Sequence, residues 1–191
     1  MADQPPLPDL TTSPSGPLPP PPGDASRLAQ DWYETYGQAV YSYVRFHLPS
    51  ADAAEDVTSD TFLKVFRAAD QYDAARGQPR TWILRIAQNT LRDHLRRARV
   101  RRHVPLGNMR DLASDAPSPE ERLLWEEQVC HLLESVSQLG EPDREVISLR
   151  YGSGMDTAAV AEVLGLGESA VRTRLWRALS RLRHLMEAAE A

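Results

Sequence analysis

From Arg27 to Glu187 the apolar side chains recur at spacings of three and four residues, and one segment, 103–119, interrupts that rhythm. Such spacing gathers side chains on one face of an α-helix. No stretch alternates apolar and polar residues as a half-buried strand does. The sequence therefore predicts an all-α protein made of two small helical domains joined by a flexible linker.

The first domain is predicted over residues 27–102. One helix begins near Arg27 and ends near Pro49, a second covers about 53–69, and a third runs from Pro79 to about Arg102, because proline suits the first turn of a helix. Residues 1–26 are rich in proline and poor in large apolar side chains, so we expect a disordered tail. Residues 103–119 contain turn formers without periodicity, which predicts the linker.

The second domain is predicted over residues 120–187. A helix near 124–139 precedes a short one opened by Pro142, and Asp156 is a good N-cap for a helix over 157–164. Gly165 to Gly167 form a tight turn before the last helix. Two helices joined by a short turn that contains glycine are typical of a helix-turn-helix, whose second helix enters the DNA major groove.

Charge is distributed very unevenly along the chain. The net charge of −5 conceals ten arginines against one acid in residues 76–110, and five arginines with no acid in residues 169–185. The segments 1–75 and 111–168 are both acidic. Such alternation predicts that separate surfaces bind separate partners.

Several classes of protein are excluded by what the sequence lacks. It has neither an apolar run long enough to span a membrane nor an apolar signal core, so we expect no membrane insertion and a cytoplasmic location. The single cysteine, Cys130, allows no disulfide within the chain, and we expect it to be partly buried. No phosphate loop, nucleophile–base pair or metal-ligand spacing is present, so we expect neither an enzyme nor a cofactor.

The last helix has one apolar and one basic face. Its predicted core face is Val171, Leu175, Ala178, Leu179, Leu182 and Met186. The remaining positions combine arginines with an aromatic side chain, as a DNA-binding face would. The candidate contacts on it are Glu168, Ser169, Arg172, Thr173, Trp176 and Arg177; Arg181 and Arg183 lie further along, where we expect phosphate contacts or none.

The third helix carries the other basic stripe. Its apolar face is formed by Ile83, Ile86, Ala87, Thr90, Leu91 and His94. Opposite it lie Arg85, Asn89, Arg92, Arg96 and Arg99. An asparagine among arginines can both donate to and accept from a base while the arginines hold phosphates. Trp82 lies where the two faces meet, and its position fits stacking on an unpaired base and packing in the core equally well.

The second helix has an acidic face instead. Its polar positions are Glu55, Asp56, Ser59, Asp60 and Lys64. DNA would be repelled there, so this face should meet a protein or solvent, and from the residues alone we favour solvent.

Three segments together resemble bacterial RNA polymerase sigma factors of the extracytoplasmic-function (ECF) type. They are AEDVTSDTFLKVFRA (54–68), RTWILRIAQNTLRDHLRR (80–97) and LRYGSGMDTAAVAEVLGLGESAVRTRLWRALSRLR (149–183), in the expected order. The likeness covers about 27–102, as region 2, and about 120–187, as region 4.

The resemblance implies a role for each surface. The helix with Asp56, Ser59 and Asp60 would dock on the clamp helices of the largest subunit of core RNA polymerase, which reverses the preference for solvent. Ser59 stands where the family often has glutamine. The last helix would recognise the minus-35 element, with Arg174 beside the DNA backbone, and region 4 would also meet the flap of the second-largest subunit.

The stripe of Trp82, Arg85, Asn89, Arg92 and Arg96 would contact and melt the minus-10 element. The turn 72–78 would receive a flipped base together with Asn89, because an extruded base needs a pocket that repays its unstacking. The resemblance also implies an anti-sigma factor as a further partner. The alternative to a promoter-directing sigma factor is a stand-alone helix-turn-helix regulator, which would need neither the acidic face nor the Trp82 stripe.

Overall fold

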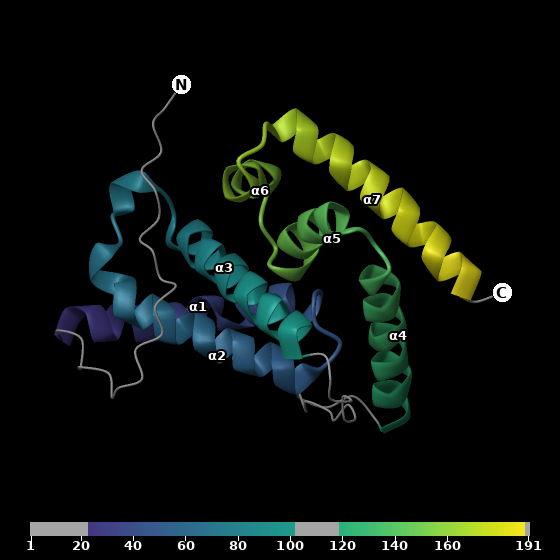
Figure 1. The fold of residues 1–191 in the computed structure, drawn as a ribbon, viewed down its shortest axis with the longest axis horizontal. Coiled ribbons are helices and arrows are strands. Elements are labelled where there is room, and N and C mark those ends of the chain that lie inside the picture. Colours follow the sequence, from purple (N-terminus) through teal and green to yellow (C-terminus); the bar gives the residue numbers. More distant parts are fainter. Residues whose placement is uncertain (1–22, 102–118, 190–191) are drawn as a thin grey trace.

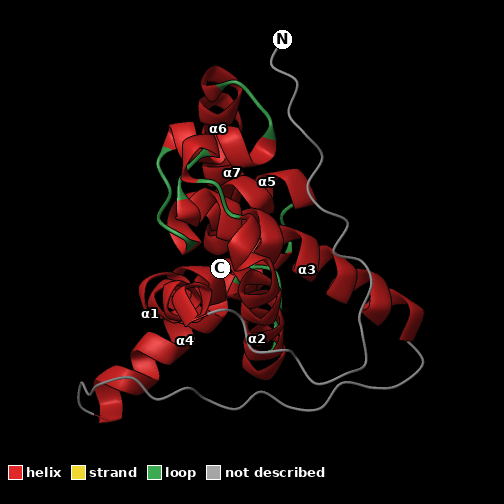
Figure 2. Ribbon diagram, turned by 90° about the vertical axis from the view of Figure 1, so that its left-hand side faces the viewer, coloured by secondary structure: helices red, strands yellow, loops and turns green. Residues whose placement is uncertain are grey.

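The computed structural model describes residues 23–101 and 119–189, and all regular structure in these ranges is helical (Figures 1 and 2). The first module contains α1 (Gly23–Arg45), α2 (Ala51–Ala68) and α3 (Pro79–Arg101), with short 3-10 turns η1 (Ala69–Gln71) and η2 (Ala74–Arg76) between α2 and α3. The second contains α4 (Pro119–Ser137), α5 (Glu141–Ile147), η3 (Ser148–Gly152), α6 (Thr157–Leu164) and α7 (Glu168–Ala189). None of these helices is long and apolar enough to cross a membrane.

The predicted helices are confirmed, but two of them begin earlier than the sequence predicts. Helix α1 begins at Gly23, so residues 23–26 belong to a helix and not to the predicted disordered tail. The rest of that tail, and the predicted linker up to residue 118, lie outside the described residues. Pro119, which the sequence pattern assigns to the linker, is the first residue of α4.

Local chemistry explains where the helices of both modules begin and end. The Ser50 side chain accepts a hydrogen bond from the Ala53 backbone N–H at 3.3 Å and caps α2. Asp156 caps α6 in the same way by accepting from the Ala159 N–H at 2.8 Å. Gly165 then ends α6 in the left-handed region at φ 64°, which glycine adopts without steric cost, and this turns the chain toward α7.

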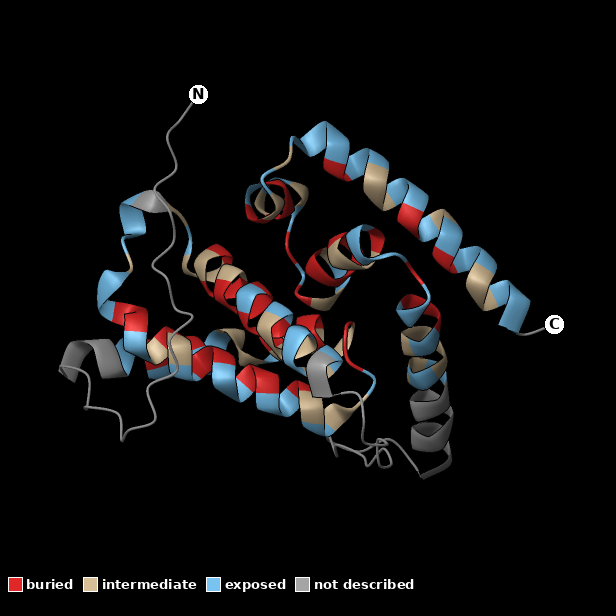
Figure 3. Cartoon of the chain, in the orientation of Figure 1, coloured by how far each residue is buried: buried red, intermediate tan, exposed pale blue. Residues whose placement is uncertain are grey.

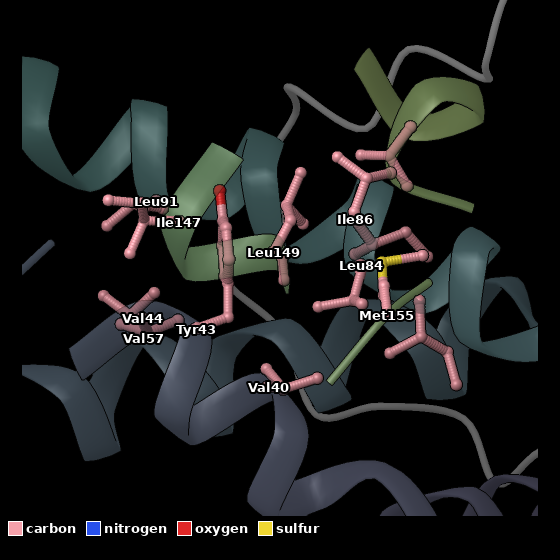
Figure 4. Packing of buried hydrophobic residues seen from close by; sticks show 14 of the residues in the cluster. Val40, Tyr43, Val44, Val57, Leu84, Ile86, Leu91, Ile147, Leu149 and Met155 are labelled. Atoms are coloured by element: carbon pink, nitrogen blue, oxygen red, sulfur yellow. The ribbon is translucent and has the colours of Figure 1, made fainter. Parts of the chain in front are cut away.

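The two modules share one hydrophobic core. Figure 3 shows the buried residues of α1, α2, α3, α5 and α6 facing the middle of the molecule. In Figure 4, Tyr43 of α1 lies beside Leu149 of η3, and Val40 of α1 and Met155 of the turn before α6 belong to the same buried cluster. All of these side chains are almost completely buried. The sequence predicted two modules joined by a tether; the structure also packs them directly against each other.

Two expectations about single residues are wrong. Leu179, placed on the core face of α7, is 37% exposed, because Val171, Ala178 and Leu182 form the line of closest approach to the core. Cys130 is exposed, since α4 meets the rest of the protein through Val136 and leaves Cys130 on the outside.

Candidate nucleic-acid interface

Helices α6 and α7 form the predicted helix-turn-helix. Val160 and Ala161 of α6 and Val171 of α7 are buried in the shared core, so the two helices hold a fixed angle across the Gly165 turn. Arg181 forms an ion pair with Asp143, a buried residue in the first turn of α5. This pair ties the far half of α7 to the protein, so Arg181 has a structural role that the sequence did not indicate.

The outward face of α7 presents the predicted contacts to solvent. Glu168, Ser169, Arg172, Thr173, Trp176 and Arg177 are all exposed, and Arg174 is half-buried. Trp176 is 71% exposed, which is exceptional for the largest apolar side chain. The Arg172 guanidinium lies 3.1 Å from the Glu168 carboxylate one turn earlier. Glu168 therefore orients Arg172 along the helix, where both can approach base edges.

The basic stripe of α3 is only partly free. Asn89, Arg92 and Arg96 are exposed, and Arg92 donates to the Asn89 side-chain oxygen at 3.5 Å. Arg96 pairs with Asp93 at 2.9 Å. Arg85, by contrast, donates to the Glu162 carbonyl oxygen of α6 at 2.8 Å. The second module thus covers one end of the stripe.

Trp82 packs inside an aromatic cluster. Its ring centroid lies 5.6 Å from those of both Trp32 and Tyr72, which themselves meet edge to face at 5.0 Å. The Tyr72 hydroxyl donates to the Gly77 carbonyl oxygen at 2.9 Å and closes the turn 72–78. The sequence left two interpretations of Trp82 open, and in the structure its contacts are those of a packed side chain. The half-buried ring packs against Tyr72 and so supports the turn 72–78.

The acidic face of α2 is accessible. Asp56, Ser59 and Asp60 are exposed, while Val57, Thr58 and Thr61 on the opposite side are buried. The two threonine hydroxyls donate to backbone carbonyl oxygens one turn back, at 2.7 Å each, so they need no outside partner. The acidic face is therefore available to a protein surface.

Sequence reasoning missed a polar network between the modules, centred on Glu145 of α5. One Glu145 carboxylate oxygen accepts from the Tyr43 hydroxyl at 2.9 Å and from the Gln88 amide at 2.6 Å. The Ser148 hydroxyl donates to the Glu145 carbonyl oxygen, so the proton between His47 Nε2 and Ser148 Oγ, which are 2.9 Å apart, belongs to His47. The one feature of the sequence that points to this network is that the charged Glu145 directly precedes the apolar Val146 and Ile147.

Burial sets the protonation of this network. Desolvation, reinforced by the positive charges of Arg144 and Arg92, lowers the pKa of His47 to about 3, so its ring is neutral at pH 7. Desolvation raises the pKa of Glu145, which the hydrogen bonds from Gln88 and Tyr43 oppose. Burial, with the Glu145 charge nearby, raises the pKa of Tyr43 well above its ordinary value, so Tyr43 remains a donor.

Comparison with known proteins agrees with this arrangement. Residues 32–101 match the family model of sigma-70 region 2, and residues 132–182 match that of sigma-70 region 4. The chain is 35% identical over 161 residues to the RNA polymerase sigma factor CnrH of Cupriavidus metallidurans, covering 80% of this chain and 83% of CnrH. The chain belongs to the ECF family of RNA polymerase sigma factors.

Another relative and two solved structures are also similar to this sigma factor. The ECF sigma factor BldN of Streptomyces coelicolor is 32% identical over 154 residues, which cover 81% of this chain but only 58% of BldN. A structure of CnrH in complex with the cytosolic domain of CnrY superposes with a TM-score of 0.61 at 29% identity, over 85% of this chain and 90% of that one. The sigma factor RpoE of Bartonella quintana, solved with the anti-sigma factor NepR, shows the same fold, with a TM-score of 0.66 at 19% identity over 85% of this chain and 98% of that one.

Proposed function

We propose that this sigma factor directs core RNA polymerase to a set of promoters and divides promoter binding between its two modules. Helix α7 recognises intact duplex at the minus-35 element through its outward face. Helix α3, with the turn 72–78, binds the minus-10 element as its strands separate. The observation that best supports this proposal is that one chain presents two separate arginine-rich helices and an accessible acidic face on α2.

The acidic face of α2 supports polymerase binding over DNA binding. Asp56 and Asp60 repel phosphates, and the exposed Ser59 between them can donate or accept a hydrogen bond. We assign this face to the clamp helices of the largest polymerase subunit, and region 4 to the flap of the second-largest subunit. A protein that acts together with RNA polymerase would act in the cytoplasm. Nucleotidyl transfer would be carried out by the polymerase and not by this chain.

An anti-sigma factor is a further proposed partner. The solved structures of CnrH and of RpoE each contain a second protein, which for RpoE is the anti-sigma factor NepR. Their similarity to this chain supports a regulator that binds it reversibly. The alternative, a stand-alone helix-turn-helix regulator, gains no support from the family models, because the region 2 model matches the chain in addition to the region 4 model.

Run-off transcription with purified core polymerase on genomic promoter fragments tests the proposal. We expect discrete transcripts that depend on the added chain. Substituting Asp56 and Asp60 by alanine should reduce transcription without weakening duplex binding by the isolated chain, and Asp31→Ala, an exposed acid on α1, is the matched control. Tight duplex binding without any promoter-specific transcript would favour the stand-alone regulator instead.

A further inference from the structure

A single acidic residue lies within the basic helix α3. Asp93 is the only acid in the sequence of α3, and it interrupts the arginines that follow Asn89. Its side chain is 15% exposed, and its two carboxylate oxygens meet cations of two different helices. One oxygen lies 3.7 Å from Nζ of Lys64 on α2, and the other lies 2.9 Å from a terminal guanidinium nitrogen of Arg96, one turn further along α3. Asp93 therefore joins the helix with the acidic face to the helix with the basic stripe.

The charge of Asp93 opposes DNA binding. Phosphates are attracted by the arginines of the stripe and repelled by a carboxylate, so charge alone would favour an uncharged residue at this position. The exposure of the two side chains shows how this conflict is reduced. The Arg96 side chain is 70% exposed, whereas the carboxylate paired with it is largely shielded from solvent. A phosphate that approaches from solvent therefore meets Arg96 before it meets Asp93.

The ion pair leaves Arg96 able to bind DNA. A guanidinium has several N–H donors in a rigid fork, so the donors that do not face Asp93 can still meet a phosphate. A free arginine side chain loses rotamer freedom when it binds, and a side chain that is already held in place loses less. Lys64 contributes to this order, because it holds the other oxygen of Asp93 from α2. The three residues thus fix one guanidinium before DNA arrives.

Arg96 also lies on the face of α3 that carries Asn89. Positions 89, 92 and 96 follow the spacing of one helix face, and all three side chains are exposed. A rise of about 1.5 Å per residue places Arg96 about 10 Å from Asn89 along the helix axis, which is the rise of about three stacked nucleotides. A strand with one base at Asn89 can therefore reach Arg96 with its backbone.

We propose that Asp93 is a positioning residue for promoter opening: Lys64 holds it in place, and it fixes the Arg96 guanidinium for the backbone of the separated strand. The inference rests on the proposed function, because it adds a residue to the opening role assigned to α3. It differs from a purely structural link between α2 and α3, because it requires Asp93 to act through Arg96. It also differs from a simple charge effect, since Asp93 makes the stripe less positive and yet favours opening.

Removing the charge of Asp93 should change two measurements in opposite directions. Asp93→Asn keeps the shape of the side chain and makes α3 more positive, so the full chain should bind an unrelated duplex at least as tightly as the parent in fluorescence anisotropy. Holoenzyme that contains this variant should open a promoter about three to ten times more slowly, because a charge-assisted contact is loosened but not lost. Opening is followed by permanganate reactivity over time, at a promoter that is active in run-off transcription.

The control variant makes the same change of charge elsewhere in region 2. Asp31→Asn neutralises an exposed acid on α1 and should open the promoter at the rate of the parent. Equal opening rates for Asp93→Asn and the parent would overturn the proposal, and so would a loss of the same size in Asp31→Asn.

A double-mutant cycle tests whether Asp93 acts through Arg96. Arg96→Ala should slow opening more than Asp93→Asn does, because it removes the contact outright. The variant that carries both substitutions should be no slower than Arg96→Ala alone, since there is no longer a guanidinium to position. Losses that multiply would mean that the two residues act independently, and the proposal would be wrong.

Exchanging the two charges separates positioning from stability. Lys64→Asp combined with Asp93→Lys restores an attraction between α2 and α3 but places a cation beside Arg96. Thermal unfolding should bring the exchanged variant closer to the parent than Asp93→Lys alone, while its promoter opening stays slow. Opening at the rate of the parent would show that a link between the helices is sufficient, against the proposal. The cycle with Arg96 decides the question even if the exchanged variant fails to fold.

Failure of this inference and failure of the proposed function give different results. A parent that opens no promoter with core polymerase defeats the proposed function, and this inference with it. A parent that opens promoters no faster than Asp93→Asn defeats only the role of Asp93.

Discussion

Trp176 is the side chain whose removal should separate DNA binding from folding most cleanly. It lies on the outward face of α7 among Arg172, Thr173 and Arg177, and is 71% exposed. A tryptophan side chain offers roughly 200 Å² for burial, so a DNA partner could cover about 140 Å², worth up to about 3.5 kcal/mol at 25 cal/mol per Å². Because a groove surface is partly polar, we expect Trp176→Ala to cost about 2 kcal/mol, a roughly thirtyfold loss of affinity.

The assay is fluorescence anisotropy of an upstream-element duplex, taken from a promoter active in run-off transcription, titrated with the full chain at fixed salt. Tyr151→Ala is the matched control, because Tyr151 is a 54% exposed aromatic residue of region 4 that lies in η3 and not on α7. Thermal unfolding should leave both variants within about 0.5 kcal/mol of the parent, as surface substitutions usually do. Equal duplex affinities for the parent and Trp176→Ala would refute the assignment of this face to DNA.

Three other predictions concern single side chains. Arg172→Ala should lose about 1–3 kcal/mol of discrimination at one upstream base in competition binding, whereas Arg183→Ala should weaken all sequences alike; uniform loss for Arg172→Ala would make it a phosphate contact. Asn89→Ala should reduce strand opening, measured by permanganate footprinting, more than it reduces binding of the closed promoter, and equal loss of both would argue against a role in melting. His47, whose pKa falls from 6.5 to about 3 on folding, takes up a proton only on unfolding, so its contribution to stability is lost as the pH falls below 6.5. Between pH 6 and 5 the parent should therefore lose about 1 kcal/mol more stability in urea titrations than His47→Gln, and parallel losses would mean that His47 is not held neutral.

Local rules predicted the helices, including the two that carry arginine-rich faces. The Asp156 cap, the Gly165 turn and the start of α3 at Pro79 each depend on residues within a few positions of one another. The outward face of α7 follows from helical periodicity in the same way, and its exposed residues are those expected from the sequence. The local prediction that was wrong concerns the exposure of one side chain. Leu179 lies at the edge of the apolar arc, where a small rotation of α7 decides its exposure.

Contacts between distant residues could not be predicted. Tyr43 and Glu145 are 102 positions apart, and Gln88 and Glu145 are 57 apart, so no periodicity links them. Trp82 could equally have faced solvent, since its burial depends on where Trp32 and Tyr72 meet it. Resemblance to a family supplied roles for the separate modules, but it gave no reason to expect that one carboxylate would join them.

The unequal accessibility of the two basic helices has a kinetic consequence. With the two modules packed against each other, the outward face of α7 is open, while Arg85 at the start of the α3 stripe is engaged by Glu162. Under the proposed function, this form would offer its upstream-reading face to duplex DNA before the whole α3 stripe is free to meet separated strands. Upstream binding would then precede strand separation, and an encounter with an unsuitable sequence would end while the duplex is still paired.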